Sequence, residues 1–157
     1  FMKGIKGAMP AIVLLGLAYP LNKLSSEMGT ANFIINSFDS LLQPEFLPVI
    51  IFIAAAIMSF STGSSWGTFA ICMPIALPLA FHVTNNEMSV LVAICFAAVA
   101  SGGIFGDHCS PVSDTTILSS MGSACDHIDH VKTQLPYALC VASISAAFYL
   151  VAGYALV

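Results

Sequence analysis

The stretch that decides the fold is residues 106–116, which read GDHCSPVSDTT and lie within a strongly apolar chain. This stretch carries two carboxylates, Asp107 and Asp114. An ionised Asp costs about 2.5–3.5 kcal/mol at the centre of a bilayer, so it is kept only where a cation, a proton or local hydrogen-bond donors satisfy it. Segment 106–116 therefore predicts a break in a membrane helix that carries an ion or proton site.

The composition of the whole chain indicates a membrane environment. Of the 157 residues, 58% are hydrophobic and 8% are charged, whereas a soluble domain carries about a quarter charged residues. The mean hydropathy is +0.93. The chain has no Arg and a net charge of −4, so no basic patch exists for phosphates. These values exclude an ordinary cytosolic domain, a disordered chain and a nucleic-acid-binding protein.

The apolar runs predict an all-α integral membrane protein, a polytopic helical bundle with two discontinuous segments in one domain over residues 1–157. The expected elements are a span over 7–24, an interfacial helix over 28–43, a broken or re-entrant segment over 46–60 and 66–81, a broken segment over 88–105 and 111–121, a polar loop over 122–134, and a last span over 135–157.

The two interruptions are the most informative part of this pattern. At 1.5 Å per residue, each apolar run between residues 46 and 81 reaches only about 20–23 Å, against about 30 Å of hydrocarbon. The polar residues between the runs must then lie at membrane depth, where irregular backbone is tolerated only inside protein or beside a wet cavity. Discontinuous helices of this kind mark the binding sites of secondary transporters, so we expect half of such a fold.

Lysine placement bears on whether segment 46–81 crosses the membrane or dips in and returns. A re-entrant hairpin puts Lys3, Lys6 and Lys132 on one side and Lys23 on the other. A crossing segment splits the four lysines evenly. The positive-inside rule therefore favours the re-entrant hairpin, with the N-terminus in the cytoplasm.

The chemistry of the break at 106–116 suits a hard cation that competes with a proton. Desolvation favours the protonated form of a carboxyl group and a bound cation favours the ionised form, so Asp107 or Asp114 can hold either H+ or Na+. Uncharged oxygen ligands come from four hydroxyls, those of Ser110, Ser113, Thr115 and Thr116. This competition is the physical basis of sodium/proton exchange, and it predicts a transporter rather than an enzyme, with no cofactor and no zinc.

Three residues of this break have a simpler alternative. Asp107 could lie at the mouth of the cavity and be merely solvated. Ser110 followed by Pro111 is typical of a helix N-cap, and Asp114 in the first turn would then only suit the helix dipole. His108 could relay protons to a carboxylate, or it could be a polar side chain that only fills space and is oriented by the loop.

The second break covers residues 61–67, which read STGSSWG. Gly63 allows close backbone approach, the hydroxyls can line a cavity, and the single Trp can wall it. The candidate cavity residues are Ser61, Thr62, Gly63, Ser64, Ser65 and Trp66. The alternative is a plain turn with Trp66 in an interfacial aromatic belt.

The cysteines and the polar loop give no strong metal or disulfide signal. Three of the five Cys lie inside apolar runs, so we expect no disulfide framework. Cys125, His127 and His130 make a zinc site conceivable, but a solvated polar loop is the favoured interpretation. The pair His108–Cys109 fits no zinc spacing.

Three motifs carry a resemblance to a known family. Segment 106–116 resembles the signature of the NhaC-type sodium/proton antiporters of the ion transporter superfamily. Residues 62–68 (TGSSWGT) with 73–76 (MPIA), and residues 134–138 (QLPYA), are similar to the same family. The resemblance implies a multi-pass antiporter in the inner membrane of a prokaryote that exchanges Na+ for H+. Some relatives exchange malate for lactate instead.

Chains of this family are longer, and this one resembles their C-terminal part. The resemblance therefore implies a fragment whose partners are the lipid bilayer, the missing N-terminal half of the transporter and, as a further candidate, a second copy.

Two other functions stay open. A sodium-coupled organic-anion exchanger could hold a carboxylate at half-helix N-termini near Ser64 and Ser110, although no Arg is present to clamp it. A non-transporting membrane subunit, or a membrane metalloenzyme using Asp107, His108 and Cys109, is the alternative from another class.

Overall fold

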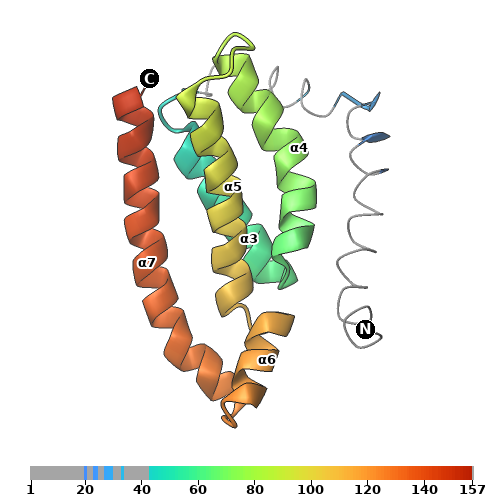
Figure 1. Ribbon diagram of the computed structural model, residues 1–157, viewed down its shortest axis with the longest axis vertical. Helices are drawn as coiled ribbons and strands as arrows, with labels where there is room; N and C mark the ends of the chain where they lie inside the picture. The colour runs from blue at the N-terminus through green and yellow to red at the C-terminus, as the bar shows by residue number, and fades with distance from the viewer. Residues whose placement is uncertain (1–19, 21–22, 25–26, 30–32, 34–42, 157) are drawn as a thin grey trace, which may run out of the picture.

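The computed structural model describes Pro20, residues 23–24, 27–29, Phe33 and residues 43–156. Within these residues the long elements are all helices: α3 (Leu47–Thr62), α4 (Ser65–Val83), α5 (Val90–Cys109), α6 (Asp114–Gly122) and α7 (His127–Leu156). The predicted all-α class is confirmed for this part of the chain (Figure 1). The span expected over 7–24 and the interfacial helix expected over 28–43 lie almost entirely outside the described residues.

Helices α3 and α4 form a hairpin whose turn is Gly63–Ser64 (Figure 1). Gly63 ends α3 in the left-handed region with φ +67°, a conformation that glycine adopts without strain. Ser64 then caps α4, because its hydroxyl accepts the backbone N–H of Gly67 at 3.2 Å. The local sequence thus reverses the chain within two residues.

Helix α4 is longer than the apolar run that predicts it, since it extends from Ser65 to Val83. Its 19 residues are long and apolar enough to cross a membrane, as are Val90–Cys109 and His127–Ala155. Helix α3, with 16 residues, is the shorter arm of the hairpin. The prediction that both arms are too short to cross the membrane is therefore confirmed for α3 and wrong for α4.

Helix α5 packs closely on α3 through small residues. An ideal Cβ on Gly102 would lie 2.5 Å from the carbonyl oxygen of Phe52, and one on Gly106 would overlap the backbone of Phe60. The buried core beside this contact joins α3, α4 and α5 and consists of Leu47, Ile51, Phe52, Ala76, Ala80, Leu91, Val92, Cys95, Ala98 and Val99. Side chains larger than hydrogen at the two glycines would force the helices apart.

The segment after α5 differs from the prediction in two places. Helix α6 begins at Asp114 rather than at residue 111, because Ser113 and not Ser110 is its N-cap and accepts the N–H of Thr115 at 3.2 Å. Helix α7 begins at His127 rather than at residue 135, so the polar loop expected over 122–134 is mostly helix.

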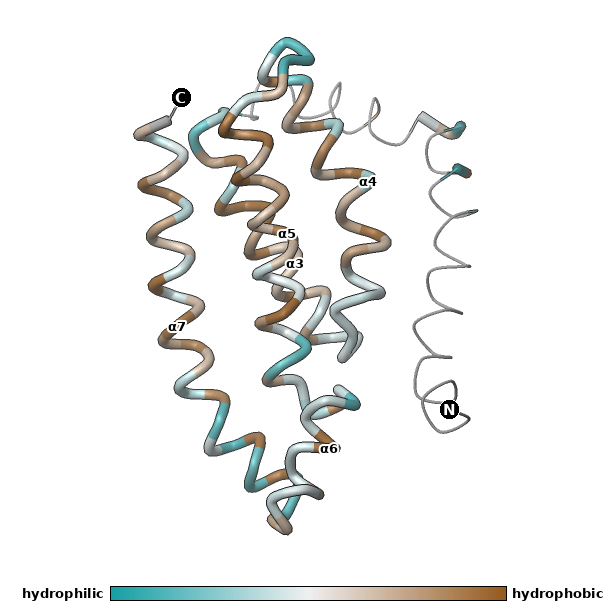
Figure 2. The backbone as a smooth tube through the Cα atoms, in the orientation of Figure 1, coloured by the Kyte–Doolittle hydropathy of each residue, from teal (hydrophilic) through white to brown (hydrophobic). Residues whose placement is uncertain are grey.

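The early start of α7 has a local cause. The Asp126 carboxylate accepts the backbone N–H of Ile128 at 2.9 Å and that of Asp129 at 3.2 Å, which caps the helix. The first turns are polar, and the helix becomes apolar further along (Figure 2). Exposed apolar side chains on α7, such as Phe148 at 70%, leave this helix suited to contact lipid or more protein.

Candidate ion-binding site

The two irregular segments predicted from the sequence contact each other directly. An ideal Cβ on Gly63, at the tip of the α3–α4 hairpin, would lie 2.7 Å from the carbonyl carbon of Val112, which belongs to the α5–α6 break. The Ser110 hydroxyl donates to the carbonyl oxygen of Phe60 at 2.7 Å. The hairpin tip therefore packs against the break, and only glycine fits at position 63.

The carboxylate of Asp107 lies where these segments meet. It belongs to the last turns of α5 and is half-buried. One oxygen, Oδ1, accepts the Ser113 hydroxyl at 2.7 Å, and Oδ2 accepts the Ser65 hydroxyl at 3.0 Å. One donor comes from the α5–α6 break and the other from the first turn of α4, so the carboxylate joins the two.

Asp107 is bound by hydroxyls and not by a countercharge. Within the part of the chain that the structure describes, ion pairs join Lys23 to Glu27 and Lys132 to Asp129, and none reaches Asp107. In this part of the chain the carboxylate is therefore satisfied by hydrogen bonds from uncharged groups.

Further hydroxyls close the break around the end of α5. Ser113 and Thr115 share a hydrogen bond of 2.7 Å between their side-chain oxygens. Since the Ser113 proton goes to Asp107, Thr115 donates to Ser113, and the Asp107 carbonyl at 3.3 Å is an alternative acceptor for the Thr115 proton. The Thr116 hydroxyl donates to the His108 carbonyl at 3.1 Å. These bonds satisfy carbonyls that the end of a helix leaves without partners. Ser113 and Thr116 are buried, so the break is packed inside protein.

The other predicted residues of the 106–116 break have different places. Ser110 is fully buried and fastens the break to α3 rather than facing the carboxylate. Asp114 is the first residue of α6 and is exposed. Among the described residues no hydrogen bond or ion pair involves the Asp114 side chain, and its place matches the helix-start alternative.

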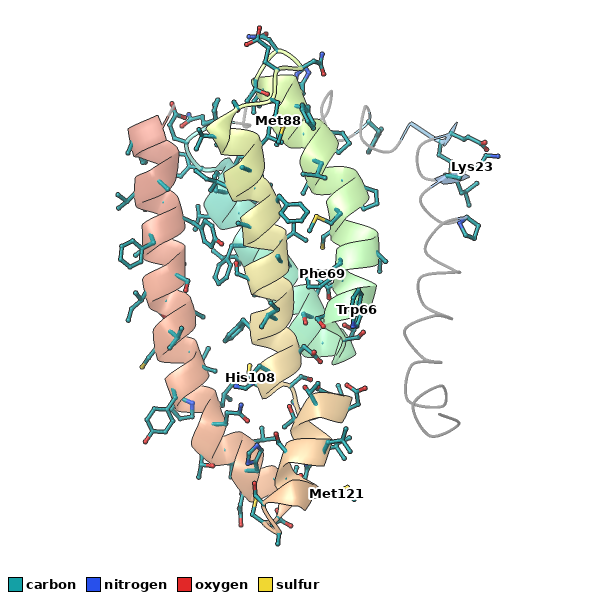
Figure 3. The ribbon with its side chains drawn as sticks, in the orientation of Figure 1. Lys23, Trp66, Phe69, Met88, His108 and Met121 are labelled. Atoms are coloured by element: carbon teal, nitrogen blue, oxygen red, sulfur yellow. The ribbon has the colours of Figure 1, made fainter. Side chains whose placement is uncertain are left out.

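Most hydroxyls of the second break bond to their own helix. Ser61 donates to the Ile57 carbonyl at 2.8 Å and Thr62 donates to the Met58 carbonyl at 2.9 Å, which is ordinary i to i−4 bonding. Trp66 is 51% exposed and meets Phe69 edge to face, with ring centroids 6.1 Å apart (Figure 3). Of the six predicted cavity residues, Ser65 reaches the carboxylate, Gly63 contacts the break and Ser64 caps α4.

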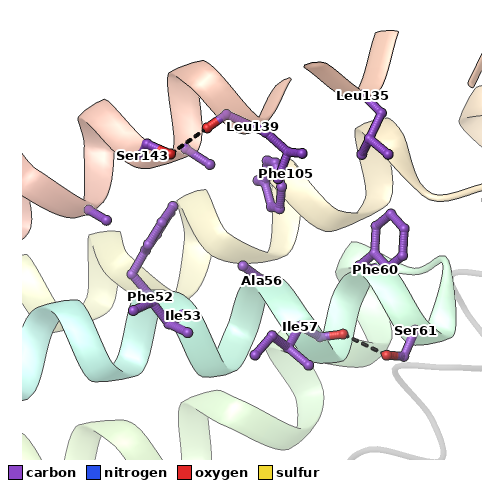
Figure 4. Close-up of a pocket in the computed structure, with 12 residues that line it drawn as sticks. Phe52, Ile53, Ala56, Ile57, Phe60, Ser61, Phe105, Leu135, Leu139 and Ser143 are labelled. Carbon is purple, nitrogen blue, oxygen red and sulfur yellow. Dashed lines mark hydrogen bonds between the residues drawn. The ribbon is translucent and has the colours of Figure 1, made fainter. Parts of the chain in front are cut away.

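His108 lies on the side of α5 that faces α7 (Figure 3). It lines a cavity of about 520 Å³ with Gln134 and Tyr137 of α7. A second cavity of about 520 Å³, mostly apolar, lies between α3, α5 and α7 (Figure 4). Between the described residues no hydrogen bond connects the imidazole of His108 to Asp107, so a proton relay between them would need water.

Two residues of this region carry contacts that the sequence analysis did not assign. The buried Ser59 hydroxyl donates to the Gly103 carbonyl and ties α3 to α5. His127, expected in a solvated loop, contacts the carbonyl oxygen of Pro111 in the break at 2.7 Å. A Ser within an apolar run could have signalled the first contact, whereas nothing in the spacing signals the second. In the described part of the chain no three His, Cys, Asp or Glu side chains gather as a metal site would require.

A family model described as the Na+/H+ antiporter family matches residues 1–154. The chain belongs to this family. The match confirms the resemblance to the NhaC-type antiporters, and together with the three long apolar helices it indicates a multi-pass membrane protein.

Relatives of the antiporter family agree with this assignment. A Haemophilus influenzae protein described as uncharacterized is 48% identical over 96% of this chain and 28% of its own length. The malate-2H(+)/Na(+)-lactate antiporter of Bacillus subtilis is 27% identical over 96% of this chain and 31% of its own length. The Na(+)/H(+) antiporter NhaC of Alkalihalophilus pseudofirmus is 28% identical over 82% of this chain and 27% of its own length.

The chain thus spans between 27% and 31% of the length of these three relatives. The Bacillus and Alkalihalophilus relatives are both described as antiporters. No solved structure matches the chain significantly.

Proposed function

We propose that this chain is part of a secondary transporter that exchanges Na+ for H+, with Asp107 as the group that carries either ion. One observation carries the proposal: a half-buried carboxylate, with no ion pair among the described residues, is held by hydroxyls from two separate helix breaks. Intramembrane carboxylates of this kind are functional by default, because their burial is otherwise unfavourable.

Hydroxyl groups make the exchange chemically simple. Ser65 and Ser113 each donate a hydrogen bond to the Asp107 carboxylate. With H+ bound, Asp107 becomes a donor, and one serine can rotate to accept from it. With Na+ bound, both hydroxyls can turn a lone pair to the ion while the carboxylate supplies the charge, a set of hard oxygens that suits this cation. One site thus serves both ions, but not together.

Asp114 has a secondary role in this proposal. It is exposed at the start of α6 and belongs to the same break as Ser113. An exposed carboxylate next to the site raises the local concentration of cations without binding them tightly. We therefore place Asp114 at the mouth of the site, with Thr115 and Thr116 shaping the break.

We propose a re-entrant arrangement for the α3–α4 hairpin. Its two open ends lie beside the start of α5, and its tip lies beside the α5–α6 break (Figure 1). If α5 and α6 together cross the membrane, the tip stops at the depth of the break. The host membrane in this proposal is the plasma membrane of a prokaryote, and the rest of a longer chain completes the cavity, with a second copy as a further candidate partner.

A sodium-coupled organic-anion exchanger is the second candidate function. Two helix N-termini, those of α4 at Ser65 and α6 at Asp114, begin at the same site and could attract a carboxylate. The Bacillus subtilis relative is described as a malate and lactate antiporter. Proteoliposomes with the complete transporter separate the two functions, because only the second requires malate or lactate for Na+ movement.

The test of the proposed function is Asp107→Asn in the complete transporter that contains this chain. Asn keeps the shape and the hydroxyl contacts but cannot hold a proton or neutralise Na+. We expect Na+-dependent proton flux in everted vesicles to fall more than about tenfold, the range seen when metal-site groups are altered.

The matched control is Asp129→Asn, because Asp129 is an exposed carboxylate whose ion pair is with Lys132, away from the site. The control should keep its flux. If Asp107→Asn is expressed at the same level and transports as well as the parent, Asp107 is not the carrier.

A further inference from the structure

The apolar cavity between α3, α5 and α7, here the α3–α7 cavity, has a volume of about 520 Å³ (Figure 4). Its hydrophobic lining includes Phe52, Phe60, Phe105, Leu135 and Leu139. Ser61 and Ser143 also line it, but each hydroxyl donates at 2.8 Å to a carbonyl of its own helix. Because little in this lining can hold water, the cavity suits an apolar occupant.

The α3–α7 cavity is open at the side of the bundle. Ile57 of α3 and Leu139 of α7 both line it, yet they are 63% and 50% exposed. Phe105 contributes a third wall from α5. In a membrane, the medium beside such helices is hydrocarbon. A lipid chain can therefore enter the cavity from the side.

The dimensions of the α3–α7 cavity suit one hydrocarbon chain. Its lining extends from Leu135 to Ala146 on α7 and from Phe52 to Ser61 on α3, which at 1.5 Å per residue corresponds to about 14–17 Å. A volume of about 520 Å³ over this length leaves a mean width of about 6–7 Å, against about 10–12 Å for a helix with its side chains. Carbon contact distances of about 4 Å let a single chain fit. The length is about half of the roughly 30 Å hydrocarbon core, the share of one leaflet.

A positive charge lies on the same face of α7, beyond one end of the cavity. Lys132 precedes Leu135 by three residues and Leu139 by seven, a spacing that puts the three on one face of a helix. Leu135 and Phe60 lie together at one end of the cavity (Figure 4). The Lys132 side chain is 70% exposed, and its ion pair with Asp129 at 3.5 Å contributes little to stability. Its ammonium group is therefore available to a phosphate.

We propose that the α3–α7 cavity binds one acyl chain of a phospholipid, whose phosphate contacts Lys132. Basic residues beside clefts between membrane helices bind lipid headgroups, and the long Lys stem can follow the apolar surface while its ammonium stays at the interface. The first turns of α7 are polar and the later ones apolar, which matches a headgroup followed by a chain (Figure 2). Asp107 does not line this cavity, so the lipid site is independent of the proposed ion exchange.

The test is photolabelling of the detergent-solubilised complete transporter with phosphatidylcholine that carries a diazirine in one acyl chain. We expect saturable labelling of Phe60 and Phe105, which line the cavity, and non-saturable labelling of Val151, which is exposed on α7 and lines neither cavity. Lys132→Gln should raise the half-saturating lipid concentration about fivefold, the weight of one basic residue at a headgroup. Lys23→Gln is the matched control, because Lys23 is equally exposed and also pairs with an acid on its own helix. It should behave as the parent.

A second pair of variants tests the cavity itself. Ser143→Phe places a ring in the α3–α7 cavity from an exposed position and should abolish the saturable labelling of Phe105. Ala147→Phe adds the same ring at an exposed position of α7 that lines neither cavity, and it should leave the labelling unchanged.

Three results would overturn the proposal. Labelling of Val151 without Phe60 and Phe105 in the parent would show that another part of the complete transporter, or a second copy, covers the cavity. An unchanged half-saturating concentration in Lys132→Gln would remove the phosphate contact. Saturable labelling that persists in Ser143→Phe would place the chain elsewhere. Since none of these readouts uses Na+ or proton flux, the lipid site and the exchange function stand or fall separately.

Discussion

The two helix breaks have similar composition and very different roles. Both are rich in hydroxyls and contain glycine or proline. In the break at 61–67, however, the Ser61 and Thr62 hydroxyls donate to carbonyls of their own helix. The break after α5 directs its hydroxyls to Asp107 and to the free carbonyls at the helix end. What distinguishes them is where the hydroxyls lie. Ser61 and Thr62 lie in the last turn of α3, next to its carbonyls, whereas residues 110–113 form a turn outside both helices, from which the Ser113 hydroxyl reaches Asp107.

The largest effect should come from filling the contact between the breaks. Gly63→Ala places a methyl group against Val112 and requires alanine at φ +67°. Overlap and left-handed strain together should lower the free energy of unfolding by about 2–4 kcal/mol. Thermal unfolding of the detergent-solubilised complete transporter measures this.

Gly122→Ala is the control for that experiment, because nothing lies within 4 Å of an ideal Cβ at Gly122, and its φ is not positive. It should be neutral or slightly stabilising. Equal melting temperatures for the two variants would show that the breaks do not depend on close contact.

A middle-sized effect is expected for Ser113→Ala. This change removes the N-cap of α6 and the 2.7 Å bond to Asp107 at once. We expect about 1–2 kcal/mol of lost stability and a weaker apparent affinity for Na+. Ser113→Thr, which keeps a hydroxyl, should restore most of both; if it does not, the hydroxyl is not what matters.

The smallest effects separate the hydroxyls of the break at 61–67 from one another. Ser65→Ala removes one donor from Asp107 and should weaken apparent Na+ affinity about three- to tenfold. Ser61→Ala removes only a bond to its own helix and should leave both affinity and stability within about 0.5 kcal/mol of the parent. Sodium dependence of proton flux compares them, and indistinguishable variants would contradict the assignment of Ser65 to the site.

Charge in an apolar context is what singled out Asp107 as a candidate site residue. Asp107 stands out in the sequence because an unpaired carboxylate at membrane depth needs a reason, and the helix class follows from the apolar runs. Which hydroxyl reaches Asp107 was not predictable, because back-bonding to a helix and bonding across a break use the same residue types. The start of α7 was also missed, since polar residues 127–134 resemble a loop until Asp126 is recognised as a cap.

The glycine contact between α3 and α5 has a mechanical consequence. At Gly102 and Gly106 the backbones of α3 and α5 lie too close for a larger side chain, so sliding one helix along the other would bring bulkier residues into these two contacts. Helices with such an interface move together as a single rigid body. If Asp107 carries the ions as we propose, we expect the hairpin and α5 to form a static frame, and the rearrangement that opens the site to alternate sides of the membrane to occur in α6 and α7, beside the two cavities that α7 lines.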